Sequence, residues 1–207
     1  MGFEGPQLIP ERIQETKIPE KEEILERTPT VRDTQEQLEK SPKQMLEDIQ
    51  AARPVVEWVT YVPDKQYGAK VSLPHECFIG GNINYLDENK AQLYIDMFQV
   101  NEKIQKGGVG TRLLKSFVAE GKDYGATELY GHITSDSALK TRARVFGLEN
   151  LEFYNHNTKE RLPIDFEQAL ASAKDGRVDY DVRIDLSKVD TSDWEMPEKI
   201  ETSNQAD

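Results

Sequence analysis

Six consecutive residues, Gln105 to Gly110 (QKGGVG), contain three glycines and are followed directly by Thr111. Glycine lets a backbone bend sharply and approach a ligand without a side chain in the way. If a helix begins at such a turn, its first backbone N–H groups are unpaired and the positive end of its dipole faces outward. This combination binds anions, and phosphate in particular. The stretch is therefore predicted to be a phosphate-binding turn.

The flanking sequence supplies the two elements that must hold this turn. The preceding residues, Leu93 to Val100 (LYIDMFQV), are apolar and partly β-branched over the length of a strand. The following residues predict an amphipathic helix that ends near Gly125. Its apolar face is made of Leu113, Leu114, Phe117 and Val118. Strand, glycine turn and helix then form one continuous unit around the anion site.

Composition excludes several classes of function. A net charge of −12 argues against sequence-independent binding of nucleic acid, because that affinity comes from Lys and Arg, and it suits cationic partners better. A single cysteine, Cys77, and three histidines give no metal-ligand spacing, so no metal site is predicted. No run approaches the roughly 20 apolar residues of a membrane helix, and the N-terminus does not resemble a signal peptide. A cytoplasmic protein without membrane contact is expected.

The chain divides by composition into three parts. Residues 1–28 are polar and rich in proline, which predicts a flexible N-terminal arm. Residues 29–190 are predicted to form one globular domain, and residues 191–207 an acidic flexible tail. Two short helices are expected at residues 34–38 and 42–52, the second with Ser41 as its N-cap and Pro42 at its first position.

Within the domain, strands and helices alternate in an order typical of an α/β (α+β) fold. Three strands form an antiparallel meander, in which Gly80-Gly81 indicates a bulge or a close backbone contact. A fourth strand follows the central helix, so the two are joined by a β-α-β crossover with parallel pairing. The predicted strands are residues 55–62, 78–86, 92–100, 127–134, 151–155 and 179–186, and the later helices are residues 138–146 and 166–174.

This order resembles that of the GNAT superfamily of acetyl-CoA-dependent N-acyltransferases. The family's acyl-CoA signature is Gln or Arg, two residues, Gly, one residue, then Gly or Ala, and Gln105 to Gly110 match it after a strand and before a helix. Gly80-Gly81 also looks like the family's usual third strand. The resemblance implies a mixed, mostly antiparallel sheet with helices on both faces, and acetyl-CoA as co-substrate without a metal.

The resemblance also implies which residues bind CoA. The turn and the first helical residues would hold the pyrophosphate, and the end of the preceding strand would pair with the pantetheine arm. These residues are Phe98, Gln99, Val100, Gln105, Lys106, Gly107, Gly108, Val109, Gly110, Thr111 and Arg112. The basic residues Lys140, Arg142 and Arg144 are expected on the solvated face of their helix, with contact to the 3′-phosphate as the alternative.

Catalytic residues are predicted from alternation along the strands. Asp96 would share a face with Tyr94 and Phe98, where burial would raise its pKa and suit it to act as a base; the alternative is a carboxylate on a solvated face. His132 and Tyr130 alternate onto one face of the next strand and could relay a proton, with a structural histidine as the alternative for His132. The family often has a tyrosine on the helix before Gly147 to protonate the thiolate, and this chain has none there, so Tyr154 or a water molecule would substitute.

Two functions follow from these expectations. The first is an N-acetyltransferase that acetylates a primary amine, either of a cationic small molecule or of a protein lysine or N-terminus. The second is a non-catalytic acyl-CoA-binding or protein-interaction module of the same fold. A Walker-type ATPase is disfavoured, because Gly110 is followed directly by Thr111, where such proteins have a lysine. A homodimer is expected by analogy with related architectures.

Overall fold

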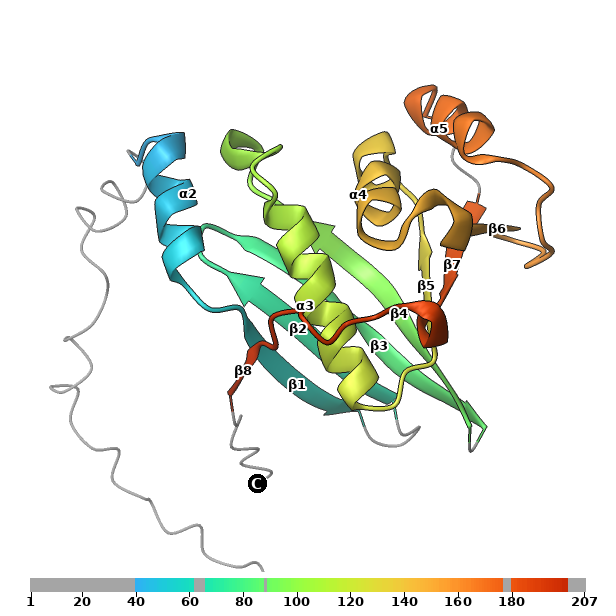
Figure 1. Ribbon diagram of the computed structural model, residues 1–207, viewed down its shortest axis with the longest axis horizontal. Helices are drawn as coiled ribbons and strands as arrows, with labels where there is room; N and C mark the ends of the chain where they lie inside the picture. The colour runs from blue at the N-terminus through green and yellow to red at the C-terminus, as the bar shows by residue number, and fades with distance from the viewer. Residues whose placement is uncertain (1–39, 62–65, 88, 177–179, 201–207) are drawn as a thin grey trace, which may run out of the picture. The chain divides into compact units, whose positions relative to one another are not determined.

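The computed structural model describes residues 40–61, 66–87, 89–176 and 180–200 of the chain (Figure 1). A compact unit begins at Ser41, and the functional residues predicted above lie within it. The predicted arm at residues 1–28 and the predicted helix at residues 34–38 lie outside the described residues.

Eight strands form a single mixed sheet in the order β6-β7-β5-β4-β3-β2-β1-β8. Neighbouring strands are antiparallel except for the pairs β4 with β5 and β1 with β8. The strands are β1 (Val55–Tyr61), β2 (Gln66–Leu73), β3 (Cys77–Asp87), β4 (Lys90–Gln99), β5 (Glu128–His132), β6 (Glu152–Asn155), β7 (Tyr180–Asp185) and β8 (Glu198–Ile200). The mixed, mostly antiparallel sheet is as predicted.

The helices are α2 (Pro42–Ala51), α3 (Val109–Asp123), α4 (Asp136–Phe146) and α5 (Phe166–Lys174), with short 3₁₀ turns at Glu102–Ile104, Leu148–Asn150 and Leu186–Lys188. Helix α3 connects the parallel strands β4 and β5, so the predicted β-α-β crossover is confirmed. Ser41 caps α2 through a hydrogen bond from the backbone N–H of Gln44, whose side chain bonds back to Ser41. This capping box explains why α2 begins where the sequence predicts.

The described helices gather on one face of the sheet, whereas helices were expected on both. Helix α3 crosses in front of the sheet in Figure 1, and Leu93 and Ile95 of β4 are buried on that side. The side chains that alternate with them, such as Tyr94 of β4 and Tyr130 of β5, remain partly exposed. Aliphatic residues occupy only one face of these strands. Helices packed on that face therefore bury apolar surface, whereas helices on the other face would cover polar side chains.

The core lies between this face and the helices. Leu113, Leu114 and Phe117 of α3 are buried against the aliphatic residues of the central strands, as the amphipathic pattern predicts. At Gly121, a Cβ atom would come within 2.5 Å of a methyl group of Leu93, so the missing side chain lets α3 approach the sheet closely. Helix α3 therefore packs closely on this face of the sheet over β2, β3 and β4, and the glycine turn follows the end of β4.

Two strands were not predicted. Strand β2 alternates buried Ala69, Val71 and Leu73 with Lys70 and Ser72, a strand pattern that sequence reasoning missed, and it pairs with β1 and β3 on either side. Strand β8 is a polar three-residue segment that pairs with Val55 to Glu57 of β1. The acidic tail predicted from residue 191 is thus anchored to the sheet as far as Ile200.

Candidate active site

Strand β4 contains a bulge at Asp96. Gly81 of β3 pairs with Ile95 and Gly80 pairs with Met97, so Asp96 is the extra residue between them. A Cβ atom on Gly81 would lie 1.7 Å from the carbonyl oxygen of Tyr94, so only glycine permits this close approach. The sequence therefore predicted the irregularity correctly from Gly80-Gly81.

The bulge changes which residues share a face. Simple alternation placed Phe98 with Tyr94 and Asp96, but the extra residue shifts the pattern by one position. Phe98 turns to the helix side, where its ring lies 3.4 Å from the position that a Cβ atom on Gly110 would occupy. Met97 is left 53% exposed instead. Phe98 thus packs beside the start of α3, and the predicted common face of Tyr94, Asp96 and Phe98 is wrong.

Strands β4 and β5 separate just before the glycine turn. Their parallel register runs from Gln92 paired with Glu128 to Ile95 paired with Gly131. Strand β4 continues to Gln99, and beyond Ile95 no described strand pairs with it on that side. Unpaired backbone along a strand edge can pair with an extended ligand as if it were another strand.

The glycine turn is the N-terminal cap of α3, as predicted. Gly108 is the N-cap residue, with a φ of +81° that favours glycine, and no side chain caps the helix there. A Cβ atom on Gly108 would meet nothing within 4 Å, so the space in front of it is open. Lys106 also has a positive φ, of 73°. The uncapped N–H groups of the first helical turn remain available for an anion.

A cleft of about 1290 Å³ joins these features. Ten of the predicted site residues border it: Asp96, Phe98, Gln99, Val100, Gln105, Lys106, Gly108, Val109, Gly110 and Thr111. Three do not, namely Gly107, Arg112 and Tyr154. Gly107 instead packs against α2, where a Cβ atom would come within 2.5 Å of a methyl group of Leu46.

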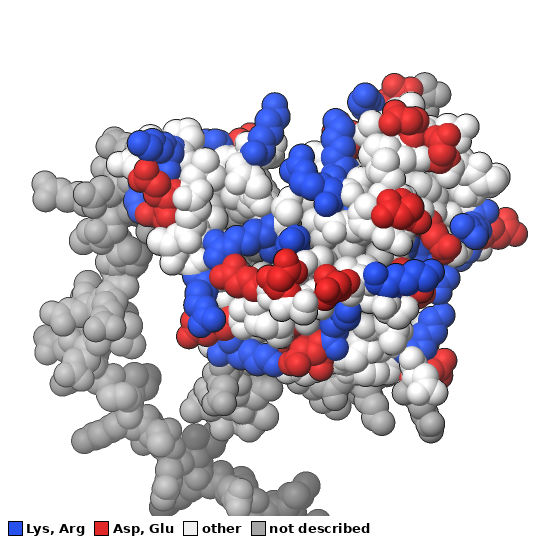
Figure 2. Space-filling model, viewed as in Figure 1, with Lys and Arg blue, Asp and Glu red and all other residues white. Residues whose placement is uncertain are grey.

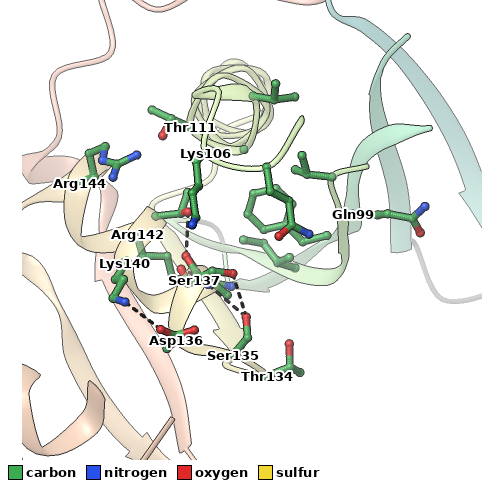
Figure 3. Close-up of a pocket in the computed structure, with 18 of the residues that line it drawn as sticks. Gln99, Lys106, Thr111, Thr134, Ser135, Asp136, Ser137, Lys140, Arg142 and Arg144 are labelled. Carbon is green, nitrogen blue, oxygen red and sulfur yellow. Dashed lines mark hydrogen bonds and ion pairs between the residues drawn. The ribbon is translucent and has the colours of Figure 1, made fainter. Parts of the chain in front are cut away.

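Five Lys and Arg residues line this cleft, together with the four carboxylates of Glu76, Asp96, Glu102 and Asp136. Figure 2 shows Lys and Arg side chains on both sides of the hollow at the top of the view. Figure 3 shows Lys106 and Thr111 on one side of the cavity, with Lys140, Arg142 and Arg144 of α4 on the other. Lys140 is paired with Asp136, one turn earlier on the helix, at 2.8 Å. The positive charges favour binding of an anionic ligand.

Arg112 does not face the cleft, although the sequence placed it with the phosphate. Its guanidinium group donates two hydrogen bonds to the carboxylate of Glu195, at 2.8 and 2.9 Å. It also donates to the carbonyl oxygens of Ile49 and Ala52 at the end of α2. These partners lie far away in the sequence, so the prediction from position alone was wrong. Arg112 joins α2, α3 and the C-terminal segment.

Asp96 lies in the cleft and accepts a hydrogen bond of 2.7 Å from the side-chain amide of Asn82. Partial burial raises the pKa of Asp96, and the bond from Asn82 offsets part of that rise. The direction of this shift is the one predicted, although the carboxylate still reaches solvent. Asp96 is thus placed to accept a proton or to attract a cation.

A second polar cluster borders the cleft around Asp181 of β7, which is buried. Nδ1 of His156 lies 2.7 Å from Oδ1 of Asp181, and Nδ1 of His132 lies 3.3 Å from the same oxygen. The other oxygen accepts hydrogen bonds from Tyr130 and from Nζ of Lys159, the latter at 2.9 Å. His132 and His156 both line the cleft. We call these five residues the Asp181 cluster.

The Asp181 cluster keeps its carboxylate ionised. Burial alone raises the pKa of Asp181, but the hydrogen bonds from Tyr130, His156 and Lys159 outweigh it and hold the pKa below its usual value. The bond to Asp181 raises the pKa of Lys159 to about 12. Nδ1 of His156 can then donate to a permanent acceptor, which leaves Nε2 as the atom able to take a proton.

His132, His156 and Asp181 also have the composition of a metal site, with one ligand atom of each within 4.8 Å of the others. No metal was predicted from the sequence. The ammonium group of Lys159 is bound to the same carboxylate, and its charge opposes a cation there. We therefore interpret the cluster as a hydrogen-bonded network centred on the pair of His156 and Asp181.

Sequence reasoning singled out His132 and Tyr130 but missed His156, Lys159 and Asp181. Asp181 alternates with the apolar residues of β7, and this position on the polar face was the only signal available. Tyr154, predicted as the proton donor, instead donates its hydroxyl to Glu152 at 2.9 Å and lies against the guanidinium of Arg183. Neither partner borders the cleft.

Comparisons with known proteins give distant similarities only. No family model matches the chain, and no curated protein matches it in sequence. An N-acetylglutamate synthase from Neisseria gonorrhoeae, solved with coenzyme A and N-acetyl-glutamate, is 13% identical with a TM-score of 0.35, over 57% of this chain and 25% of that one. A Bacillus subtilis acetyltransferase, solved with CoA, is 12% identical with a TM-score of 0.39, over 65% of this chain and 99% of that one. The chain thus spans a quarter of the length of the first.

No helix among the described residues is long and apolar enough to cross a membrane.

Proposed function

We propose that the protein is a GNAT-type N-acyltransferase that transfers an acetyl group from acetyl-CoA to a primary amine. One observation carries the proposal: the open edge of β4 beyond Ile95 leads directly to the uncapped start of α3 at Gly108. An extended ligand that ends in phosphate fits this combination of an unpaired strand edge and an anion site.

Acetyl-CoA has the chemistry that these two features require. Its pyrophosphate would lie against the N–H groups between Gly108 and Thr111, with Lys106 beside it. The amide groups of its pantetheine arm would pair with the backbone of β4 between Asp96 and Gln99. This arrangement directs the thioester toward the point where β4 and β5 separate, next to Ile95 and Gly131.

The Asp181 cluster lies at the same end of the cleft and supplies a base. A primary amine must be neutral to attack the thioester carbonyl, so a proton has to leave it. We assign this role to Nε2 of His156, with Asp181 holding the ring in the required tautomer. The C–N bond forms, the C–S bond breaks, the departing thiolate takes a proton from water, and His156 returns the amine proton to the hydroxide that remains.

Asp96 would attract the protonated form of the acceptor to the opening of the cleft. An acidic chain with net charge −12 favours a cationic acceptor, such as a small-molecule amine, a protein lysine or a protein N-terminus. Asp96 is also the alternative base, as the sequence predicted, and substitutions separate the two assignments. The second candidate function, an acyl-CoA-binding module without catalysis, shares the turn and the strand edge but needs no base.

Two measurements test the proposal. Calorimetric titration of acetyl-CoA measures binding, and release of free thiol in the presence of an amine panel measures turnover. We expect binding together with amine-dependent thiol release. Binding without turnover would favour the non-catalytic module, and failure to bind acetyl-CoA would exclude both functions.

A further inference from the structure

Arg142 of α4 is buried without a compensating negative charge. It is only 2% exposed and is the bulkiest fully buried side chain in the described part of the chain. Its Nε atom has no hydrogen-bond partner, and Nη1 makes a single long bond of 3.4 Å to the carbonyl oxygen of Ala138. Among the residues described, no carboxylate forms an ion pair with it. From the sequence, this side chain was expected on the solvated face of the helix with Lys140 and Arg144, with contact to the 3′-phosphate of CoA as the alternative.

An unpaired buried charge is costly, because the protein does not replace the hydrogen bonds lost from water. This burial lowers the pKa of Arg142 to about 10, which still leaves the guanidinium charged at neutral pH. Replacement of such a group by an apolar side chain of similar size is often neutral or stabilising. A role in folding therefore does not account for Arg142.

The surrounding residues make room for the guanidinium group. A Cβ atom on Gly131 of β5 would lie 3.1 Å from Nη2 of Arg142 and 3.3 Å from Cβ of Ile95. Any other residue at this position would push against the arginine. Arg142 also borders the cleft, beside Ser137 and Lys140 in Figure 3. The site is thus formed by β4, β5 and α4 together.

The position of Arg142 separates it from the phosphate end of the cleft. Ile95 and Gly131 are the last pair in the register of β4 with β5, whereas the glycine turn packs against Phe98 and Val100, further along β4. The guanidinium therefore lies at the inner end, where the proposed function places the thioester. It approaches from the helix side of the sheet, and Asp181 extends from the opposite side of β7.

We propose that Arg142 binds a carboxylate of the substrate at the inner end of the cleft. This inference rests on the CoA-dependent acyl transfer of the proposed function and specifies its substrate class; a carboxylate on the donor would replace acetyl by a dicarboxylic acyl group. The carboxylate has two sources. It is either the free end of a dicarboxylic acyl group carried by CoA, such as succinyl, or the α-carboxylate of an amino acid that acts as acceptor. Guanidinium and carboxylate groups form paired hydrogen bonds of matching geometry.

The first test measures binding of CoA, acetyl-CoA and succinyl-CoA by calorimetry to the wild type, Arg142→Met and Lys174→Met. Lys174→Met is the control, because it removes an exposed cation of α5 that does not border the cleft. If the donor carries the carboxylate, the wild type and Lys174→Met bind succinyl-CoA about 10- to 100-fold more tightly than acetyl-CoA, and Arg142→Met loses this preference.

The second test distinguishes the acceptor. L-Lysine and cadaverine are both primary amines, and only L-lysine has the carboxylate. A preference for L-lysine in kcat/KM with acetyl-CoA, lost in Arg142→Met, assigns the carboxylate to the acceptor. The proposal is overturned if neither preference exists in the wild type or if the preference persists in Arg142→Met.

Thermal unfolding shows whether Arg142 binds a carboxylate or only stabilises the fold. This result does not depend on whether CoA binds. Arg142→Met should have a Tm equal to or above that of the wild type, and free succinate should raise the Tm of the wild type only. A Tm loss in Arg142→Met without any succinate effect would make Arg142 structural. If CoA fails to bind, the proposed function is wrong, and the succinate measurement still decides the role of Arg142.

Discussion

Nδ1 of His156 lies 2.7 Å from Oδ1 of Asp181, which connects a loop residue at the cleft to a buried carboxylate on β7. His156 is 37% exposed and can meet a substrate, whereas Asp181 is inaccessible. In the proposed mechanism His156 would therefore contact the acceptor, and Asp181 would orient the ring of His156.

Substitution of His156 by asparagine is expected to reduce kcat/KM for amine acetylation by roughly 10²- to 10⁴-fold, because the proton acceptor is removed. Thiol release measures the effect, and affinity for acetyl-CoA should stay within about threefold. His75→Asn is a matched control, since His75 makes the same type of contact with Asp48, at 2.8 Å. An equal loss of activity in both variants would rule out the assignment.

Asp96→Asn distinguishes the two candidate bases. With His156 as base, the loss of Asp96 weakens attraction of the cationic acceptor, so KM should rise with kcat little changed. Steady-state kinetics at several pH values measures both constants. A larger fall in kcat for Asp96→Asn than for His156→Asn would assign the base to Asp96, whose pKa is raised by partial burial.

Tyr154→Phe should leave kcat unchanged, because the hydroxyl is bonded to Glu152 outside the cleft. The hydroxyl also accepts a long bond of 3.5 Å from Nη1 of Arg183, so the expected cost is about 1–2 kcal/mol in the free energy of unfolding. Denaturant titration and thiol release measure the two effects. A tenfold fall in kcat would instead restore Tyr154 as the proton donor.

Gly108→Trp should weaken CoA binding more than tenfold, because the indole would fill the open space before α3. Gly125→Trp is the matched control: Gly125 has a similar φ of +85°, open space around its Cβ position, and lies beyond the other end of α3. Both variants carry a strain of about 1 kcal/mol or more. Calorimetry should detect loss of CoA binding only in Gly108→Trp. Equal CoA affinities of the two variants would show that the turn does not bind the phosphates.

Arg112→Met is expected to destabilise the protein by about 1–3 kcal/mol, because it removes the bonds to Glu195 and to the end of α2. Affinity for CoA should change less than threefold in the folded variant. A double-mutant cycle with Glu195→Gln measures the part that belongs to the ion pair. A specific loss of CoA binding without a change in stability would contradict the structural role.

Acid should weaken the contribution of Asp181 to stability. Its pKa is lower in the folded than in the unfolded state, so its contribution is complete above the unfolded value of about 4 and is lost as pH falls through the folded value. Unfolding free energies of the wild type and Asp181→Asn should thus differ most above about pH 5 and converge in stronger acid. A difference that does not vary with pH would contradict the shift.

The sequence by itself determined the features that depend on neighbouring residues. Ser41 and Pro42 start α2, and Gly108 permits the φ that begins α3, because caps and turns are built from residues within one turn of each other. The apolar period of α3 and the order of the central strands were also readable for this reason. These features were enough to predict the anion site and the crossover.

Only the tertiary structure decided which side chains meet across the sheet. Because of the bulge at Asp96, Phe98 lies on the helix side of the sheet. Arg112 donates hydrogen bonds to Glu195, which is 83 residues away in the sequence. The Asp181 cluster joins β5, β7 and the segment after β6, and Gly131 of β5 leaves space for the guanidinium group of Arg142 on α4. No local pattern encodes such contacts, since each depends on strand pairing and packing between distant residues.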